Sequence, residues 1–255
     1  MARPAARAVR LIAVALAGAL LAGCGAASGG AVDPPGTVYV VNGYGGTLSV
    51  IRPDGTVADT IAAFGGGQRW LAVAPAGTPR AGTVFVPNYV DGTVSVVGPD
   101  GQPGALISSA GSGPRGIAIS PAGLPDAGTL YVTNVDATVS VIRADGTLRT
   151  TLTVGSRPQA VAIAPVGVPN AGDTYVANNG DGTVSVFHPD GTLVATIAVG
   201  LGPTGVAVAP PGTPNAGQVY VTNTGDGTVT VIEPDGTVSA TIAVGDGPTG
   251  VVVAP

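Results

Sequence analysis

Arginine and aromatic residues occupy the few loop positions at which an otherwise regular repeat changes its sequence. The six residues are Tyr44, Arg69, Trp70, Tyr89, Arg115 and Arg157. An aromatic plane beside guanidinium groups can bind a sugar or a small anion. Alternatively, Trp70, the single tryptophan, fills a gap between packed elements while the arginines remain solvated. The pattern therefore indicates a candidate ligand site without identifying the ligand.

Side chains suited to proton transfer are rare in this chain. His188 is the single histidine and Glu233 the single glutamate, and each directly precedes a Pro-Asp-Gly turn. A general base needs a partner that orients it or a nucleophile that it activates, and the sequence shows no such pairing. We therefore predict that His188 is a surface residue and that the protein is not an enzyme.

Oxygen-bearing side chains recur at similar places in successive repeats. They are Asn88, Asp91, Asn134, Asp136, Asn178, Asp181, Asn223 and Asp226. Loops rich in oxygen ligands can hold Ca²⁺, but none of these has the D-x-D-x-D-G spacing of a dedicated calcium loop. Asp and Asn also cap turns through their own backbone, which explains the recurrence. We therefore predict no metal and no cofactor.

Short β-rich runs account for most of the chain. In the last repeat they are Val219–Asn223, Thr228–Ile232, Val238–Val244 and Gly250–Ala254, separated by Gly, Pro, Asn and Asp. Such runs predict strands joined by tight turns. The same unit recurs five times, in Gly36–Ala81, Gly82–Ala127, Gly128–Ala171, Gly172–Ala216 and Gly217–Pro255. A repeat of roughly 40–50 residues is typical of propeller blades.

One segment of this unit resembles a known family. Tyr131–Asn134 and Tyr220–Asn223 both read YVTN, and the other three copies are close to it. The unit resembles the YVTN-type β-propeller repeat of cell-surface proteins, over about Gly36–Pro255. This resemblance implies a propeller fold, although relatives often have more than five blades, seven being common. It implies little about activity, because propellers serve many roles.

The repeats predict an all-β fold, a five-bladed β-propeller of four-stranded antiparallel blades. The fourth β-rich run of each repeat reads VAVAP or a close variant, and it is here called the VAVAP-type strand. This strand is expected to be innermost in its blade, and the three outer strands of that blade follow it in the sequence. The last such strand, Gly250–Ala254, would then pair with the first strand of the first repeat, so that strands from both termini close one blade. Closure would leave no exposed sheet edge. Between second and third strands, hairpins are predicted at Asp54, Asp100, Asp145, Asp190 and Asp235 because Asp-Gly favours such turns.

The N-terminus reads as an export signal. A basic start precedes the apolar run Leu11–Ala22, which is too short for a comfortable membrane span. Leu21–Cys24 resembles the lipobox of bacterial lipoproteins, which implies lipidation of Cys24 after removal of residues 1–23. The alternative is an ordinary signal peptide with a chance cysteine. Residues 24–35 then read as a flexible tether and residues 36–255 as the propeller.

Net charge narrows the possible partners. Without Arg3, Arg7 and Arg10 the chain has 7 arginines against 15 acids, about −8, and no lysine. An acidic domain without a basic stripe is a poor partner for nucleic acid or anionic lipid. The whole sequence leads us to expect a monomer, anchored to the membrane through Cys24, that binds an envelope protein or a carbohydrate without catalysis. The alternatives are a structural surface-layer-like component and a propeller hydrolase or lyase acting on a small molecule.

Overall fold

The computed structural model describes residues 34–62, 65–108 and 110–255. Cys24, the predicted signal peptide and nearly all of the predicted tether lie outside these residues. The described residues form 18 strands and no helix. Accordingly, no helix that is long and apolar enough to span a membrane occurs in this part of the chain.

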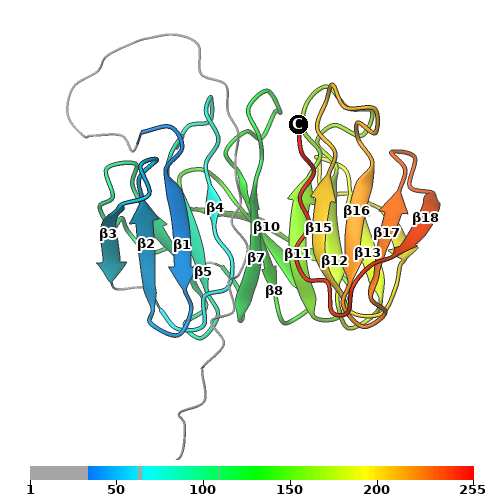
Figure 1. Ribbon diagram of the computed structural model, residues 1–255, viewed down its shortest axis with the longest axis horizontal. Coiled ribbons are helices and arrows are strands. Elements are labelled where there is room, and N and C mark those ends of the chain that lie inside the picture. Colours follow the sequence, from blue (N-terminus) through cyan, green and yellow to red (C-terminus); the bar gives the residue numbers. More distant parts are fainter. Residues whose placement is uncertain (1–33, 63–64, 109) are drawn as a thin grey trace, which may run out of the picture.

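The strands form five sheets, here called blades 1 to 5 (Figure 1). Blade 1 contains β1 (Val38–Asn42), β2 (Thr47–Ile51) and β3 (Val57–Ala62). Blade 2 contains β4 (Ala72–Val73), β5 (Val84–Asn88) and β6 (Thr93–Val97). Blade 3 contains β7 (Pro114–Ile119), β8 (Leu130–Asn134), β9 (Thr138–Ile142) and β10 (Leu148–Thr153).

The two remaining blades also have four strands. Blade 4 contains β11 (Pro158–Ile163), β12 (Thr174–Asn178), β13 (Thr183–Phe187) and β14 (Leu193–Ala198). Blade 5 contains β15 (Pro203–Val208), β16 (Val219–Asn223), β17 (Thr228–Ile232) and β18 (Val238–Ala243). All pairings are antiparallel, and β4, β7, β11 and β15 each pair with the first outer strand that follows. The all-β propeller fold and the placement of the VAVAP-type strands are thus confirmed.

The asparagine that ends the first outer strand of each blade joins it to the second outer strand by hydrogen bonds. In blade 4, Asn178 Nδ2 donates to Thr183 Oγ1 at 3.0 Å and to Ser185 Oγ at 2.9 Å. The other four blades repeat this pair of bonds from Asn42, Asn88, Asn134 and Asn223. The asparagine of the YVTN-like segment therefore joins neighbouring strands, which explains its recurrence.

The Asp-Gly pairs form the predicted hairpin turns. In every copy the aspartate Oδ1 accepts a hydrogen bond from the backbone N–H two residues later. The following glycine has a positive φ, 90° at Gly146 for example, which costs glycine little. The turns at Asp54, Asp145, Asp190 and Asp235 also lower the pKa of the aspartate, through the bonds from the following threonine.

The core lies between blades. Strands of blade 3 bury Tyr131, Val139 and Leu152 against Val176 and Phe187 of blade 4. Their other face buries Leu130, Val132 and Ile142 toward blade 2. Because both faces are covered, the strands are apolar on both sides.

Closure by both termini is not observed, which corrects the predicted ring. Among the described residues β1 pairs only with β2, and Gly250–Pro255 forms no strand. The C-terminal segment nevertheless occupies the place of a next inner strand. Thr222 Oγ1 donates to the Thr249 carbonyl at 3.3 Å, just as Thr133 Oγ1 of blade 3 donates to the Gln159 carbonyl of β11 at 3.0 Å. In Figure 1 the C-terminus lies near β15, whereas β1 is in the other half of the view.

Blade 2 departs from the four-stranded prediction at its outer edge. Where a third outer strand is expected, only the isolated bridges Val94–Ile107 and Val97–Pro103 form. Here the segment Gly101–Gly104 reads Gly-Gln-Pro-Gly in place of the Gly-Thr followed by Val or Leu that the other repeats have. Pro103 has no N–H to donate to the ladder and Gly104 weakens a strand, so only two bridges remain.

Candidate functional site

The predicted loop site is only partly assembled. Arg115 Cζ lies 5.2 Å from the centroid of the Tyr89 ring, which is a cation–π contact. Tyr44, Arg69 and Arg157 are exposed, and Trp70 is partly buried. The described contacts therefore join two of the six predicted residues.

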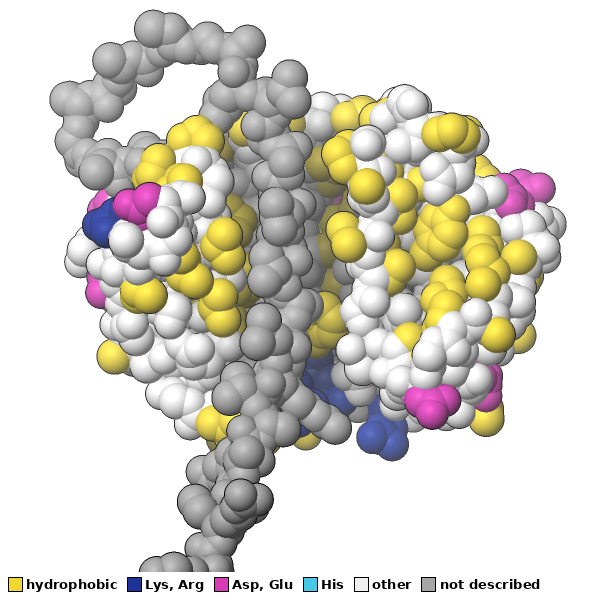
Figure 2. Space-filling view, in the orientation of Figure 1, with side chains coloured by type: hydrophobic (Ala, Val, Ile, Leu, Met, Phe, Trp, Pro, Cys, Tyr) yellow, Lys and Arg dark blue, Asp and Glu magenta, His cyan; other side chains and the backbone are white. Residues whose placement is uncertain are grey.

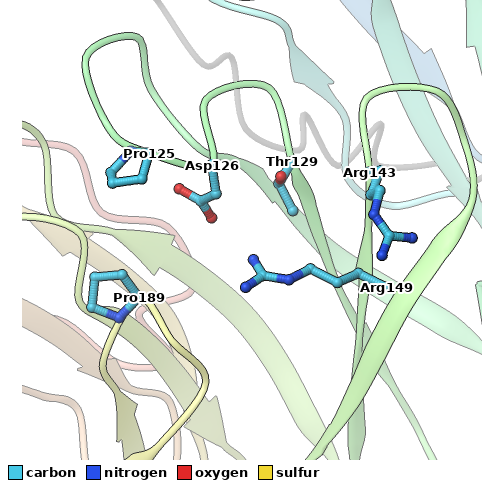
Figure 3. A pocket seen from close by; sticks show the side chains of 6 residues that line it. All are labelled: Pro125, Asp126, Thr129, Arg143, Arg149 and Pro189. Atoms are coloured by element: carbon cyan, nitrogen blue, oxygen red, sulfur yellow. The ribbon is translucent and has the colours of Figure 1, made fainter.

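A second set of residues, which the sequence interpretation missed, surrounds a cavity on the opposite rim. The cavity has a volume of about 320 Å³ (Figure 3). Its lining residues are Pro125, Asp126, Thr129, Arg143, Arg149 and Pro189. The loop before β8 contributes the first three, blade 3 contributes both arginines beside its Asp-Gly hairpin, and the β13–β14 hairpin of blade 4 contributes Pro189. We call this cavity the hairpin-rim pocket.

Three positions in and beside this pocket depart from the repeat. Asp126 stands where the other complete copies have Arg80, Asn170 and Asn215. Ser120, which contacts Asp126, stands where they have Ala74, Ala164 and Ala209. Arg149 stands where repeats with a third outer strand have Ala58, Val194 and Ser239. These departures are visible in the sequence, on the rim opposite the predicted loop site.

Asp126 is held by two hydroxyl groups. Its Oδ1 accepts from Ser120 Oγ at 2.6 Å and its Oδ2 accepts from Tyr131 OH at 2.7 Å. In blades 4 and 5 the bond runs the other way, since an asparagine Nδ2 donates to the tyrosine oxygen at 2.7 Å. The carboxylate thus turns the phenol into a donor. Burial, and then the bond to Asp126, raises the pKa of Tyr131, which stays protonated.

Two guanidinium groups line the same pocket as this carboxylate. Arg143 Nη1 donates to Thr147 Oγ1 and to the Leu148 carbonyl, both at 3.3 Å, which fixes it beside the hairpin. The Arg149 side chain extends from β10 toward Asp126 (Figure 3). A carboxylate has about four acceptor sites, so two of those on Asp126 remain for a ligand. The pocket therefore offers cationic donors on one wall and an anionic acceptor on the other.

His188 has an acid–base partner, which corrects the sequence interpretation. Its Nδ1 lies 2.9 Å from Asp173 Oδ1, and the histidine side chain is 54% exposed. The bond to Asp173 and its charge raise the pKa of His188. Blade 5 uses the same two positions for a bond from Gln218 Nε2 to Glu233 Oε1 at 2.9 Å. The pair therefore follows from the register of the blade, and His188 remains a surface residue.

Metal binding has no obvious centre in the described part of the chain. Within residues 34–62, 65–108 and 110–255, no group of three or more His, Cys, Asp or Glu side chains is placed to hold an ion. The candidate loop asparagines use Nδ2 for the strand-joining bonds described above, and Asn88 Oδ1 accepts from Gln68 Nε2 at 3.2 Å. The Oδ1 atoms of Asn134, Asn178 and Asn223 are buried and make no hydrogen bond to the described residues.

Comparison with known proteins extends the fold assignment. No family model and no curated protein sequence matches the chain. A streptogramin B lyase structure is similar with a TM-score of 0.68 and 14% identity, over 82% of this chain and 65% of that chain. Virginiamycin B lyase from Staphylococcus aureus gives 0.69 and 14%, over 84% of this chain and 69% of the other. A catalytically inactive variant of that enzyme, with quinupristin, gives 0.69 and 14%, over 86% and 71%.

These similarities show the fold, and they overturn the preferred functional prediction. The sequence favoured a non-catalytic binding module and kept a propeller hydrolase or lyase as an alternative. The similar structures are lyases, so the alternative is now better supported than a module without catalysis. This chain spans 65% of the length of the streptogramin B lyase chain.

Proposed function

We propose that this propeller is a lyase that acts on a small carboxylate-bearing molecule in the hairpin-rim pocket. One observation carries the proposal: the third repeat replaces its common residues by Ser120, Asp126 and Arg149, of which Asp126 and Arg149 line one cavity while Ser120 donates to Asp126 from behind it. The shared fold of the streptogramin B lyase supports an enzyme of this reaction class. A repeat that only builds a blade needs none of these changes.

Asp126 is the general base in this proposal. It removes the proton on the carbon next to the substrate carboxylate, and the C–H electron pair forms a C=C bond as the group on the β-carbon leaves with its own electron pair. The leaving group then takes a proton from solvent. Tyr131 and Ser120 hold the carboxylate of Asp126 in place through their hydroxyl bonds.

Arg149 and Arg143 stabilise the charge that develops during this step. Removal of the proton places negative charge on the substrate carboxylate, where guanidinium donors bind it in a bidentate manner. The pocket volume of about 320 Å³ suits a small ligand, at the lower end of ordinary ligand sites. We therefore expect β-acyloxy or β-glycosyloxy carboxylates as the substrate class.

Turnover of a panel of β-acyloxy and β-glycosyloxy carboxylates tests the proposal, because the conjugated C=C bond that forms can be followed by its absorbance. We expect Asp126→Asn to abolish turnover and to leave binding of an unreactive carboxylate analogue within a few-fold. Arg149→Met should weaken that binding about 10-fold or more, because it removes a charged bond worth roughly 1.5–3 kcal/mol. Unchanged turnover in Asp126→Asn would refute the assignment of the base.

Arg52→Met is the matched control. Arg52 occupies in blade 1 the place of Arg143 in blade 3, it is exposed, and it does not line the pocket. We expect turnover and binding in this variant to equal those of the unmodified chain. Binding of the carboxylates without any turnover would support a receptor and contradict the lyase.

We also propose that the protein is exported and attached to the membrane by lipid on Cys24, because Leu21–Cys24 resembles a lipobox. Cys24→Ala should move the protein from the membrane fraction to the soluble fraction. Ser112→Ala, a change in the propeller, should leave it in the membrane fraction. An unchanged distribution of Cys24→Ala would contradict lipidation.

A further inference from the structure

A buried hydroxyl group lies in blade 4 at a position where every other repeat has an aliphatic side chain. Thr174, in β12, stands in the place of Val38, Val84, Leu130 and Val219. It is 1% exposed, and its Oγ1 has no hydrogen-bond partner among the described residues. Aliphatic side chains are plentiful enough to reach the surface, as over blade 5 on the right of Figure 2. Because a buried, unpaired hydroxyl costs free energy that a methyl group does not, Thr174 needs an explanation.

Thr174 faces blade 3, beside Tyr131. Alternate residues of a strand lie on the same face, so Thr174 shares its face of β12 with Val176. Val176 and Phe187, the cross-strand partner of Thr174, both belong to the buried cluster that contains Tyr131. Burial and then Asp126 raise the pKa of Tyr131, whereas the Thr174 side chain lowers it, as a hydroxyl near the phenol oxygen does. Thr174 therefore lies next to the phenol that holds Asp126.

Of the three interfaces that join blades 2 to 5, only the one with an acid has this hydroxyl. Between blades 3 and 4 the three side chains are Asp126, Tyr131 and Thr174. The corresponding sets are Arg80, Phe85 and Leu130 between blades 2 and 3, and Asn170, Tyr175 and Val219 between blades 4 and 5. An amide keeps its hydrogens, whereas a carboxylate gains and loses a proton. The hydroxyl thus accompanies the one group of the three that can change from acceptor to donor.

Blade 5 shows what a phenol needs when its partner donates to it. Tyr220 OH accepts from Asn215 Nδ2 at 2.7 Å and donates to Gln218 Oε1 at 2.8 Å. The phenol hydrogen therefore goes to a second acceptor. In blade 3 the shorter Thr129 takes the place of Gln218, and the unused oxygen on the side of blade 4 is Thr174 Oγ1.

We propose that Thr174 is a positioning residue whose Oγ1 accepts the Tyr131 hydrogen bond whenever Asp126 carries a proton. In the ionised form, Ser120 and Tyr131 both donate to Asp126. Once Asp126 has taken a proton, its new O–H donates to the Tyr131 oxygen and the Tyr131 O–H turns to Thr174. No O–H bond of Tyr131 breaks, and only the direction of its hydrogen bond changes. Use of this reversal in catalysis rests on the proposed role of Asp126 as the base, whereas the reversal itself does not.

A double-mutant cycle tests the acceptor without any turnover. Asp126→Asn imitates the protonated acid, because its Nδ2 should donate to the Tyr131 oxygen as Asn170 and Asn215 do to their tyrosines. In the unmodified background, Thr174→Val should leave Tm unchanged or raise it, because a methyl group replaces an unpaired hydroxyl. In the Asp126→Asn background the same change should lower Tm by about 2–4 °C, because a buried O–H loses its acceptor. Equal effects in the two backgrounds would overturn the proposal.

Thr174→Ser is the matched control, because it keeps the hydroxyl. Its effect on Tm should be the same with Asp126 and with Asp126→Asn, and a cycle energy like that of Thr174→Val would contradict the role of the hydroxyl. Thr129→Val, measured in both backgrounds, tests the rival acceptor. If Thr129→Val and not Thr174→Val couples to Asp126→Asn, then Thr129 is the acceptor and the proposal is wrong.

Turnover of the β-substituted carboxylates separates this proposal from the proposed function. Thr174→Val should lower kcat about 3- to 10-fold with KM unchanged, and Thr174→Ser should retain most of kcat, because one hydrogen bond is lost only after proton transfer. An unchanged kcat in Thr174→Val would overturn its role as a positioning residue. If the cycle shows coupling but the unmodified chain turns over no carboxylate, the lyase proposal fails and the acceptor role of Thr174 stands.

Discussion

The outward face of blade 5 repeats, in the same register, the residues that blade 4 contributes to the interface between blades 4 and 5, yet the two faces are not equally buried. Val186 and its counterpart Val231 are both 5% exposed, whereas the isoleucines differ. Ile197 is 9% exposed and Ile242 is 48% exposed. Both follow an Ala-Thr pair within their strands, and Ile197 packs against blade 5. The difference shows that a repeat sequence specifies which face is apolar, whereas burial depends on whether a neighbouring blade is present. Stability should follow burial.

The largest effect is expected from truncating the two isoleucines. Ile197→Ala should lower the free energy of unfolding by about 3 kcal/mol, because a buried side chain is lost and a cavity remains. Ile242→Ala should cost less than about 1 kcal/mol, since its side chain is half exposed. Urea denaturation at low protein concentration measures both. Equal losses would show that blade 5 is covered within one chain.

A smaller difference is expected from two glycines of the inner strands. A Cβ on Gly116 would collide with the Gln159 carbonyl of the next inner strand, so Gly116→Ala should cost about 1–3 kcal/mol. A Cβ on Gly250 meets nothing within 4 Å, and Gly250→Ala should be neutral within about 0.5 kcal/mol. Thermal unfolding at low concentration distinguishes them. A large loss in Gly250→Ala would indicate a packed inner strand there.

The hairpin aspartates of blades 4 and 5 should contribute equally to stability, in contrast to Ile197 and Ile242. Bonds from Thr192 and Thr237 lower the pKa of Asp190 and Asp235 below the ordinary 3.8. A lowered pKa gives stability that is present above 3.8 and is lost as pH falls through the folded value. Asp190→Asn and Asp235→Asn should therefore lower Tm slightly and equally near neutral pH, and by less in acid. Unequal losses of Tm in the two variants would show that the stability of the turn depends on the neighbouring blade.

The smallest effect concerns the exposed His188–Asp173 pair. The folded pKa of His188 is raised above 6.5, so its contribution is complete below 6.5 and is lost as pH rises through the folded pKa. His188→Gln should lower Tm slightly at a pH about one unit below 6.5, and it should leave Tm unchanged at a pH about three units above 6.5. Tm measured at both values tests this. A loss that is larger in base would contradict the direction of the shift.

Much of the fold was predictable from local patterns. The Asp-Gly pairs and the β-branched runs predict the hairpins and strands, because turn type and strand pairing depend on neighbouring residues. The outer edge of blade 2 was wrongly predicted, since four strands were expected in every blade although Pro103 and Gly104 interrupt the third outer strand of this one. Closure was also not predictable, because it depends on the angle between blades, which no single repeat contains.

The candidate site was less predictable than the fold. Tyr89 and Arg115 do meet, but the hairpin-rim pocket combines residues from a loop, two strand ends and the next blade. Ser120 and Asp126 are only six positions apart and their departures are visible in the sequence. That Arg149 extends toward the same cavity depends on how β10 packs beside that loop.

By itself, the sequence determined the repeat, its strands and its turns, because these depend on backbone propensity and on alternation of side chains over a few residues. Tertiary structure alone decided that β1 and the C-terminal segment do not pair among the described residues. It also decided that equivalent residues such as Ile197 and Ile242 have different exposures. The physical reason is that burial and closure depend on the positions of whole blades. Identical residues therefore become core in one blade and surface in another.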